Sequence, residues 1–209
     1  MDDLGIIPPH QFGFRAKHST IEQAHCVTAI IQNALEAKEY CPAIYLVIQQ
    51  AFDRVWIQGL LHKVSEYLPM LYTKLLQSYL TSRKFEVHYG EAVSNIKPIL
   101  AGVPKGSVLG PLIYILFTAD IPTTDKTELA TYADDTAILA SHPQYEKAIA
   151  NLQDAVTEIT KWTRRWKIEV NTNKTVYVMY TLQNCPPTTS HSIRYKLLPH
   201  PQPNIWDST

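Results

Sequence analysis

The sequence has little cysteine, no excess of either charge and no long apolar segment. Its 209 residues include three cysteines, Cys26, Cys41 and Cys185. These are too few for a disulfide framework or a four-cysteine zinc site, so we expect an intracellular chain in a reducing compartment. No apolar run approaches the roughly 18 residues of a membrane span, and no basic leader precedes an apolar segment, so neither a membrane partner nor a signal peptide is expected. The 19 basic and 19 acidic side chains cancel, so a nucleic-acid partner would need a local basic surface.

Apolar residues make up 45% of the chain, which is enough for a packed core. Their spacing predicts alternating helices and strands. Ser19 and Glu22 form a capping box at the start of a helical pattern over 19–39. The other predicted elements are a buried strand over 43–48, two helices divided by Pro69, a strand pair within 85–100, a loop over 102–111 leading into a helix, two strands within 128–140, a helix over 143–167 and a strand over 176–180. This order predicts an α+β fold, an antiparallel sheet backed by helices on one face.

Two adjacent acids, Asp134 and Asp135, occupy the turn between the two strands predicted within 128–140. Neighbouring carboxylates at the tip of a buried hairpin repel each other and lose hydration. A hard divalent cation such as Mg²⁺ would offset that cost. An ordinary solvated turn explains the pair equally well, because acids are common in turns. The pair alone therefore leaves a metal site and a structural turn as equal alternatives.

Two further segments carry polar residues at positions where the chain bends. In the loop 102–111, Gly106 and its neighbours let the backbone approach a ligand, and Lys105 can meet a phosphate. The loop matches neither a Walker loop nor a dinucleotide fingerprint, and by itself a tight strand-to-helix connection explains it better. Phe52 and Asp53 follow the buried strand, a common place for site residues, although Asp53 alone is better explained as a helix N-cap.

Taken together, five segments resemble those of a reverse transcriptase in order and in approximate spacing. They are QFGFRAKHST (11–20), QQAFDRVW (49–56), AGVPKGSVLGP (101–111), YADD (132–135) and NTNKT (171–175). The resemblance covers roughly residues 8–182 and is closest to polymerases of jockey-type non-LTR retrotransposons, which are arthropod mobile elements. It implies a right-hand polymerase fold, with 1–42 as partial fingers, 43–182 as the palm with a finger insertion, and 183–209 as an irregular proline-rich tail.

The resemblance implies RNA-directed DNA polymerase activity, in which a primer 3′-hydroxyl attacks the α-phosphate of a dNTP with two Mg²⁺ ions as cofactors. The implied partners are an RNA template, a DNA primer and a dNTP. Asp134 matches the direct metal ligand, and Asp135 matches the supporting catalytic carboxylate. The residues that match nucleotide-binding positions are Phe52, whose ring would exclude a 2′-hydroxyl, Lys105, Gly106, and Lys174 near the triphosphate.

Two cations of the first segment, Arg15 and Lys17, match residues that contact template phosphates, and solvated surface positions explain them equally well. The resemblance further implies that the rest of the fingers, the thumb and the endonuclease segment of a longer polyprotein are absent from this chain.

The chain departs from the family at two positions of the site. The family strand reads F-L-D-x-x-x-A-F-D, and Val47 stands where its metal-binding aspartate is expected. Valine has no lone pair for a hard cation, and Asp53 lies six positions on, about 20 Å along an extended chain. Lys105 stands where the family usually has glutamine.

Three functions stay open at this point: an RNA-directed DNA polymerase domain, a catalytically dead reverse-transcriptase-like remnant that at most binds nucleic acid, and an α+β interaction module. Removing a charged ligand from a two-metal site costs several kcal/mol of transition-state stabilisation, and each ~1.4 kcal/mol changes the rate tenfold. We therefore predict the polymerase fold with weak or no turnover. The prediction requires that Val47 and the Asp134–Asp135 turn lie side by side.

Overall fold

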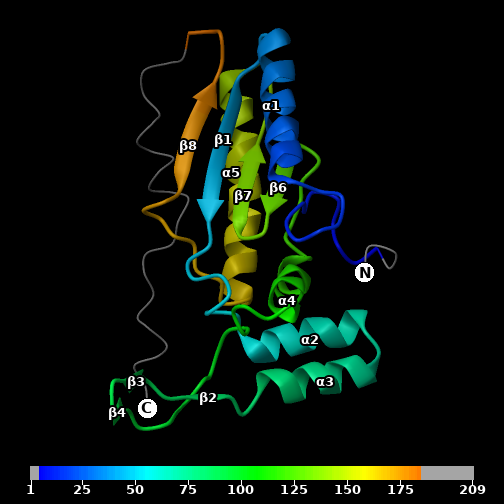
Figure 1. Cartoon of the computed structure of the whole chain (residues 1–209). Coiled ribbons are helices and arrows are strands. Elements are labelled where there is room, and N and C mark those ends of the chain that lie inside the picture. The colour runs from blue at the N-terminus through cyan, green and yellow to red at the C-terminus, as the bar shows by residue number, and fades with distance from the viewer. Residues whose placement is uncertain (1–4, 185–209) are drawn as a thin grey trace.

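The structure combines a four-stranded sheet, helices on both of its sides, and a helical hairpin with a projecting arm (Figure 1). It is a computed structural model that describes residues 5–184, so the tail predicted at 183–209 lies almost entirely outside the described residues. The helices are α1 (Thr20–Glu36), α2 (Ile57–Tyr67), α3 (Met70–Leu80), α4 (Leu109–Thr118) and α5 (Tyr145–Arg165). The strands are β1 (Cys41–Val47), β2 (Lys84–Phe85), β3 (His88–Tyr89), β4 (Ala92–Val93), β5 (Lys97–Pro98), β6 (Glu128–Tyr132), β7 (Asp135–Leu139) and β8 (Val176–Tyr180).

Local sequence patterns set the ends of several elements. The Ser19 hydroxyl accepts a hydrogen bond from the Glu22 backbone N–H at 3.2 Å, and the Glu22 carboxylate accepts one from the Ser19 N–H at 2.7 Å. The capping box is therefore confirmed, and α1 begins directly after it. Pro69 separates α2 from α3 as predicted, because proline cannot donate a backbone hydrogen bond within a helix. None of the helices within 5–184 is both long and apolar enough to span a bilayer.

β1 is an inner strand of the sheet, whose order is β6-β7-β1-β8. Its pairings with β7 and β8 are antiparallel, as is the pairing of β6 with β7, which confirms the predicted sheet type. Successive side chains of a strand point to opposite faces. Ile44 and Leu46 join the main core with α4 and α5, whereas Ala43 and Ala137 join a smaller core with α1. The expectation of helices on one face is thus corrected: both faces of β1 are apolar, so both are covered.

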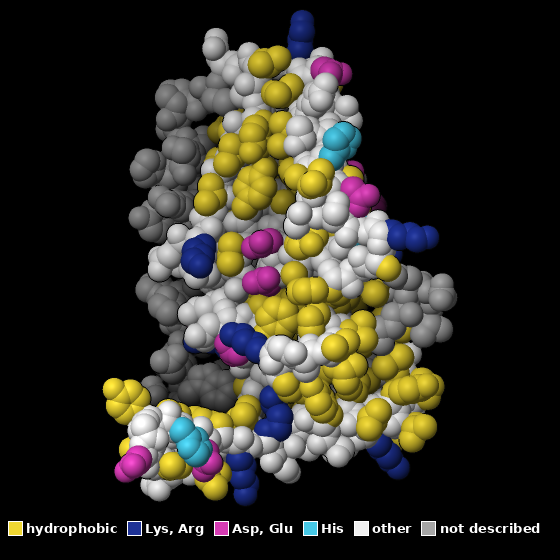
Figure 2. All heavy atoms as spheres, viewed as in Figure 1, with side chains coloured by type: hydrophobic (Ala, Val, Ile, Leu, Met, Phe, Trp, Pro, Cys, Tyr) yellow, Lys and Arg dark blue, Asp and Glu magenta, His cyan; other side chains and the backbone are white. Residues whose placement is uncertain are grey.

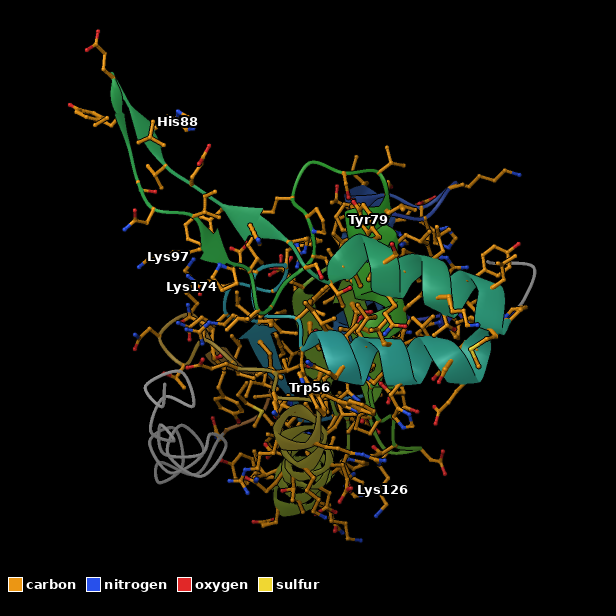
Figure 3. All side chains as sticks on the ribbon, turned by 90° about the horizontal axis from the view of Figure 1, so that it is seen from below. Trp56, Tyr79, His88, Lys97, Lys126 and Lys174 are labelled. Carbon is orange, nitrogen blue, oxygen red and sulfur yellow. The ribbon has the colours of Figure 1, made fainter. Side chains whose placement is uncertain are left out.

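The chain between β1 and α4 forms the α2–α3 hairpin and the arm. Leu60 and Val64 bury α2 in the main core, which fixes the hairpin below the sheet. The strand pair predicted within 85–100 is split into two short ladders, β2 with β5 and β3 with β4. All residues of these strands are exposed, so no core extends the pairing. Figure 3 shows this arm, with His88 and Lys97, projecting away from the helices.

Candidate active site

The two acids lie at the end of the sheet where β6 turns into β7. Tyr132 pairs with Asp135, so Ala133 and Asp134 form a two-residue loop, and the predicted acidic turn between two strands is confirmed. Desolvation and the neighbouring Asp134 carboxylate raise the pKa of Asp135, and Lys174 opposes that shift. Figure 2 shows acidic side chains in the middle of this face, where β6 and β7 meet in Figure 1. The turn therefore concentrates negative charge beside one cation.

β1 brings Val47 next to this turn. Val47 is the antiparallel partner of Asp135, so the adjacency that the sequence analysis required is confirmed. The carbonyl of Val47 also accepts a hydrogen bond from the Asn171 N–H at 2.8 Å, which ties the strand end to the segment that leads into β8. Paired residues of an antiparallel sheet point to the same face. An acid at position 47 would therefore face Asp135.

The side chains at this turn do not fit two Mg²⁺ ions. Two ions about 3.5–4 Å apart need carboxylate oxygens on both sides of the pair. Within residues 5–184, no three His, Cys, Asp or Glu side chains converge into such a set. Asp53 does not replace the acid at position 47, because its Oδ2 accepts a hydrogen bond from Lys105 Nζ at 2.5 Å. The turn supplies Asp134 and Asp135, and Val47 leaves the opposite side without a ligand.

Three aromatic rings are packed together near the turn. The ring centroid of Phe52 lies 5.0 Å from that of Tyr114 in α4 and 6.2 Å from that of Phe14. Tyr114 is 1% exposed, and no residue of the described part bonds its hydroxyl. Burial, followed by the charges of Asp134 and Asp135, raises the pKa of Tyr114, so the acids lie within electrostatic range of this ring. The sequence motifs point to Phe52 but not to Tyr114, which stands in an ordinary apolar helix pattern.

The glycine-rich loop packs against the segment that follows β1. The Val103 N–H donates a hydrogen bond to the Phe52 carbonyl at 2.7 Å. Gly102 has a φ of 82°, and a Cβ there would lie 2.5 Å from the Asp53 carbonyl oxygen, so the close approach requires glycine. Lys105 therefore pairs with Asp53, the residue that follows Phe52. The interpretation of Asp53 as a helix N-cap is wrong, since α2 begins only at 57 and Asp53 pairs with Lys105 instead.

The other predicted binding residues differ in their exposure and contacts. Gly106 has a φ of 77°, and a Cβ on it would have no neighbour within 4 Å. Lys174 is exposed in the segment before β8. The Arg15 guanidinium donates to the Gln11 carbonyl at 3.0 Å within its own segment, and Lys17 is exposed. Contacts of Arg15 and Lys17 with a template remain predictions.

The N-terminal segment reaches the acidic turn, a contact that no local sequence pattern predicts. Gln11 is 3% exposed, and its side-chain amide bonds both the N–H and the carbonyl of Ala133. Gly13 approaches so closely that a Cβ on it would lie 2.2 Å from the Ala133 nitrogen. Because the two partners are far apart along the chain, no local pattern predicts this contact. The only available hint is Gly13, a glycine that stands between two phenylalanines.

Comparisons with known proteins agree with this geometry. The family model described as reverse transcriptase (RNA-dependent DNA polymerase) matches residues 1–197. Over 198 residues the chain is 44% identical to the probable RNA-directed DNA polymerase from transposon BS of Drosophila melanogaster, covering 91% of this chain and 22% of that protein. It is 41% identical over 211 residues to the RNA-directed DNA polymerase from mobile element jockey of the same species, covering 96% and 23%. The chain thus spans less than a quarter of the length of either relative.

Among solved structures, the apo telomerase of Candida Tropicalis truncated from its C-terminal domain superposes with a TM-score of 0.62 at 15% identity. The match covers 86% of this chain and 37% of that one. At such low identity the likeness concerns the fold alone, and it agrees with the polymerase palm that the family resemblance implies.

Proposed function

Because the chain belongs to the reverse transcriptase (RNA-dependent DNA polymerase) family, we propose that it is the palm-containing part of a mobile-element RNA-directed DNA polymerase that binds primer–template and has lost most or all of its turnover. The observation that carries the proposal is the register of β1 with β7. It sets Val47 opposite Asp135, beside the Asp134 carboxylate, in a family member that retains the rest of the acidic turn.

The proposed reaction of an intact member is attack by a primer 3′-hydroxyl on the α-phosphate of a dNTP. In such a member, carboxylates at these positions would hold two magnesium ions, which would supply charge stabilisation for the attacking and leaving oxygens. We propose that Asp134 and Asp135 are what remains of their ligand set. With valine at position 47 the set lacks a carboxylate between the two strands, and turnover is expected to fall by orders of magnitude.

The proposed nucleotide site lies between the acidic turn and the glycine-rich loop. Phe52 would pack against the sugar and exclude a 2′-hydroxyl, and its ring is held between Tyr114 and Phe14. Lys174 is the cation that acts on Asp135, so we propose that it faces the triphosphate. Gly106 leaves room for a base pair or phosphate near the loop.

Lys105 stands where the family usually has glutamine, and its ammonium group forms an ion pair with Asp53. The two side chains are 63% and 47% exposed and lie 2.5 Å apart, a surface ion pair of about 0–1 kcal/mol. We propose that Lys105 contacts the nucleotide or template only after this pair opens, which makes its contribution to affinity small.

The proposed partners are an RNA template, a DNA primer and a dNTP, within a longer polyprotein. The relatives are themselves much longer than this chain, which spans less than a quarter of their length. An intracellular reducing compartment is proposed for the chain. It is supported by Cys26 and Cys41, which are free thiols. Burial raises the pKa of Cys41 to about 11, so this thiol is chemically inert.

Primer–template binding tests the proposal without requiring catalysis. A fluorescent DNA primer on an RNA template is titrated with the 209-residue chain at several salt concentrations. Log affinity should fall linearly with log salt, and Lys174→Ala should reduce that slope by about 1. Lys147→Ala is the matched control, because Lys147 is an exposed lysine on α5, behind the sheet.

A reverse-transcriptase-like remnant that binds nucleic acid and an α+β interaction module give different results in this titration. Equal loss of affinity in the Lys147 and Lys174 variants would remove the proposed role of Lys174. Absence of salt-dependent binding by the unaltered chain would reject the nucleic-acid function and favour a module whose family motifs have no present role. Efficient primer extension by the unaltered chain would contradict the proposed loss of turnover.

A further inference from the structure

We propose that Gln11 is a positioning residue. It holds the Tyr132–Asp135 turn in the conformation that directs the carboxylates of Asp134 and Asp135 toward the proposed metal site. The inference rests on the proposed function for the meaning of that turn, but its structural part stands on contacts between the N-terminal segment and the turn. Gln11 touches neither a nucleotide nor a metal in this assignment. It acts through the backbone of Ala133.

Three hydrogen bonds connect the Gln11 side chain with its surroundings. Its Oε1 accepts from the Ala133 N–H at 3.0 Å and from the Gly13 N–H at 2.7 Å. Its Nε2 donates to the Ala133 carbonyl at 3.4 Å. One amide side chain therefore satisfies both backbone groups of a single loop residue, as a neighbouring strand would do.

Ala133 needs such a clamp because its backbone conformation is unfavourable for alanine. It has a φ of 57°, which places it in the left-handed region that glycine adopts readily and L-residues with a Cβ do not. Conformations of this kind persist where the surroundings over-determine them. Asp134 follows directly in the chain, so a relaxation of Ala133 to negative φ would swing the peptide that carries Asp134.

The segment around Gln11 is itself docked along the edge strand. The Phe12 N–H donates to the Thr131 carbonyl at 2.9 Å, and the Thr131 N–H donates to the His10 carbonyl at 2.9 Å. Gln11 forms a parallel bridge with Thr131. The segment thus pairs with β6 near the end of that strand. Beyond it, the Gln11 side chain forms the hydrogen bonds to the Ala133 backbone that a paired strand would otherwise make.

Gly13 makes this arrangement sterically feasible. A Cβ at Gly13 would lie 2.2 Å from the Ala133 nitrogen and 3.0 Å from Gln11 Oε1. A larger residue would push the segment off the turn. The glycine and the glutamine of QFGF therefore serve one purpose: close approach to the loop residue that precedes the first acid.

Amide hydrogen exchange, measured by NMR on the full chain, tests the structural part. Gln11→Ala should speed exchange of the Ala133 amide by about tenfold or more, because its acceptor is removed. Gln23→Ala is the matched control, since Gln23 is also a buried glutamine, 8% exposed, but lies in α1. Gln11→Met, which preserves volume without the hydrogen bonds, replaces Gln11→Ala if the latter does not fold.

Rescue separates positioning from general support of the fold. Ala133→Gly removes the conformational penalty, so the combination of Gln11→Ala with Ala133→Gly should recover the chemical shifts of the Asp134 and Asp135 amides. The Gln23 variant should not respond to Ala133→Gly. The proposal is overturned if Gln11→Ala leaves exchange at Ala133 unchanged, if the Gln23 variant speeds it equally, or if Ala133→Gly fails to rescue.

The functional part is read in a Val47→Asp background. There, Gln11→Ala should lower kcat for primer extension by about tenfold with the KM for dNTP nearly unchanged, and Ala133→Gly should restore kcat. A rise in KM alone would overturn the positioning role. If Val47→Asp shows no extension at all, the proposed function fails, while the exchange and rescue experiments still decide the role of Gln11.

Discussion

Replacing Val47 by aspartate should create a third carboxylate beside Asp135 and make the turn responsive to magnesium. The register puts position 47 directly opposite Asp135, and paired residues have Cβ atoms about 4.5–5.5 Å apart. The unaltered chain has no ionisable group at this position, so its stability should depend little on Mg²⁺. The variant adds charge repulsion that only a bound cation removes.

The size of the effect follows from the distance and the exposure of the site. Two like charges about 5 Å apart repel by about 3 kcal/mol at an effective dielectric of about 20, and by about 0.8 kcal/mol in bulk water. Asp135 is exposed, so the lower part of this range applies. A loss of about 1 kcal/mol lowers the Tm by about 2–4 °C in a chain of this size.

Thermal unfolding with EDTA and with millimolar Mg²⁺ measures this effect. Val47→Asn is the matched control, because asparagine has the same shape as aspartate without its charge. Val47→Asp should be less stable than Val47→Asn in EDTA, and Mg²⁺ should remove the difference. The asparagine variant and the unaltered chain should shift little with Mg²⁺.

Primer extension on an RNA template completes the test. Val47→Asp should raise the extension rate by roughly a hundredfold over the unaltered chain, since restoring a ligand of the proposed two-metal site would regain several kcal/mol of transition-state stabilisation. Val47→Asn should not. Position 47 is not a metal-ligand position if Mg²⁺ stabilises all three chains equally, or if aspartate and asparagine at position 47 behave alike in both assays.

Three further predictions concern residues that the structure brings together. Burial lowers the pKa of Lys63 to about 8, whereas in an unfolded chain a lysine keeps its proton to about pH 10. Between these pH values the unfolded state binds more protons than the folded state, so stability should increase with pH. The urea midpoint should therefore rise over this interval by an amount that is absent in Lys63→Met. Gly13→Ala should destabilise the chain by about 1–3 kcal/mol in urea unfolding, because its Cβ would overlap the Ala133 backbone. Lys105→Gln should change the unfolding free energy by less than about 1 kcal/mol, since its exposed pair with Asp53 is weak, and a larger loss would show that the pair anchors the loop.

Local patterns in the sequence were sufficient for most helices and strands. Ser19 and Glu22 mark the start of α1, Pro69 divides α2 from α3, and the two short strand-like runs around the acid pair predict the β6–β7 turn. These features depend on residues within one or two turns of each other. The arm was less predictable, because its ladders are only two residues long and fully exposed.

Residues of the site were predicted only where they stand in a recognisable segment. Asp53 was misinterpreted as a helix N-cap, because its partner Lys105 lies 52 positions further on. Tyr114 was overlooked because an apolar helix pattern does not indicate which ring packs on Phe52. Lys63 is 0% exposed and lies 3.8 Å from the Trp166 ring centroid, and nothing in its surroundings along the chain indicates burial of a charge.

The amino-acid sequence alone is enough to derive most helices and strands, the family resemblance and the valine at position 47. The three-dimensional packing was needed to show that Val47 pairs with Asp135 and that Gln11 binds Ala133 across a separation of 122 residues. The difference arises from the range of the forces involved. Capping, periodicity and turn preferences act between neighbours, whereas the order of strands in a sheet and the docking of a distant segment depend on how all apolar faces are buried together.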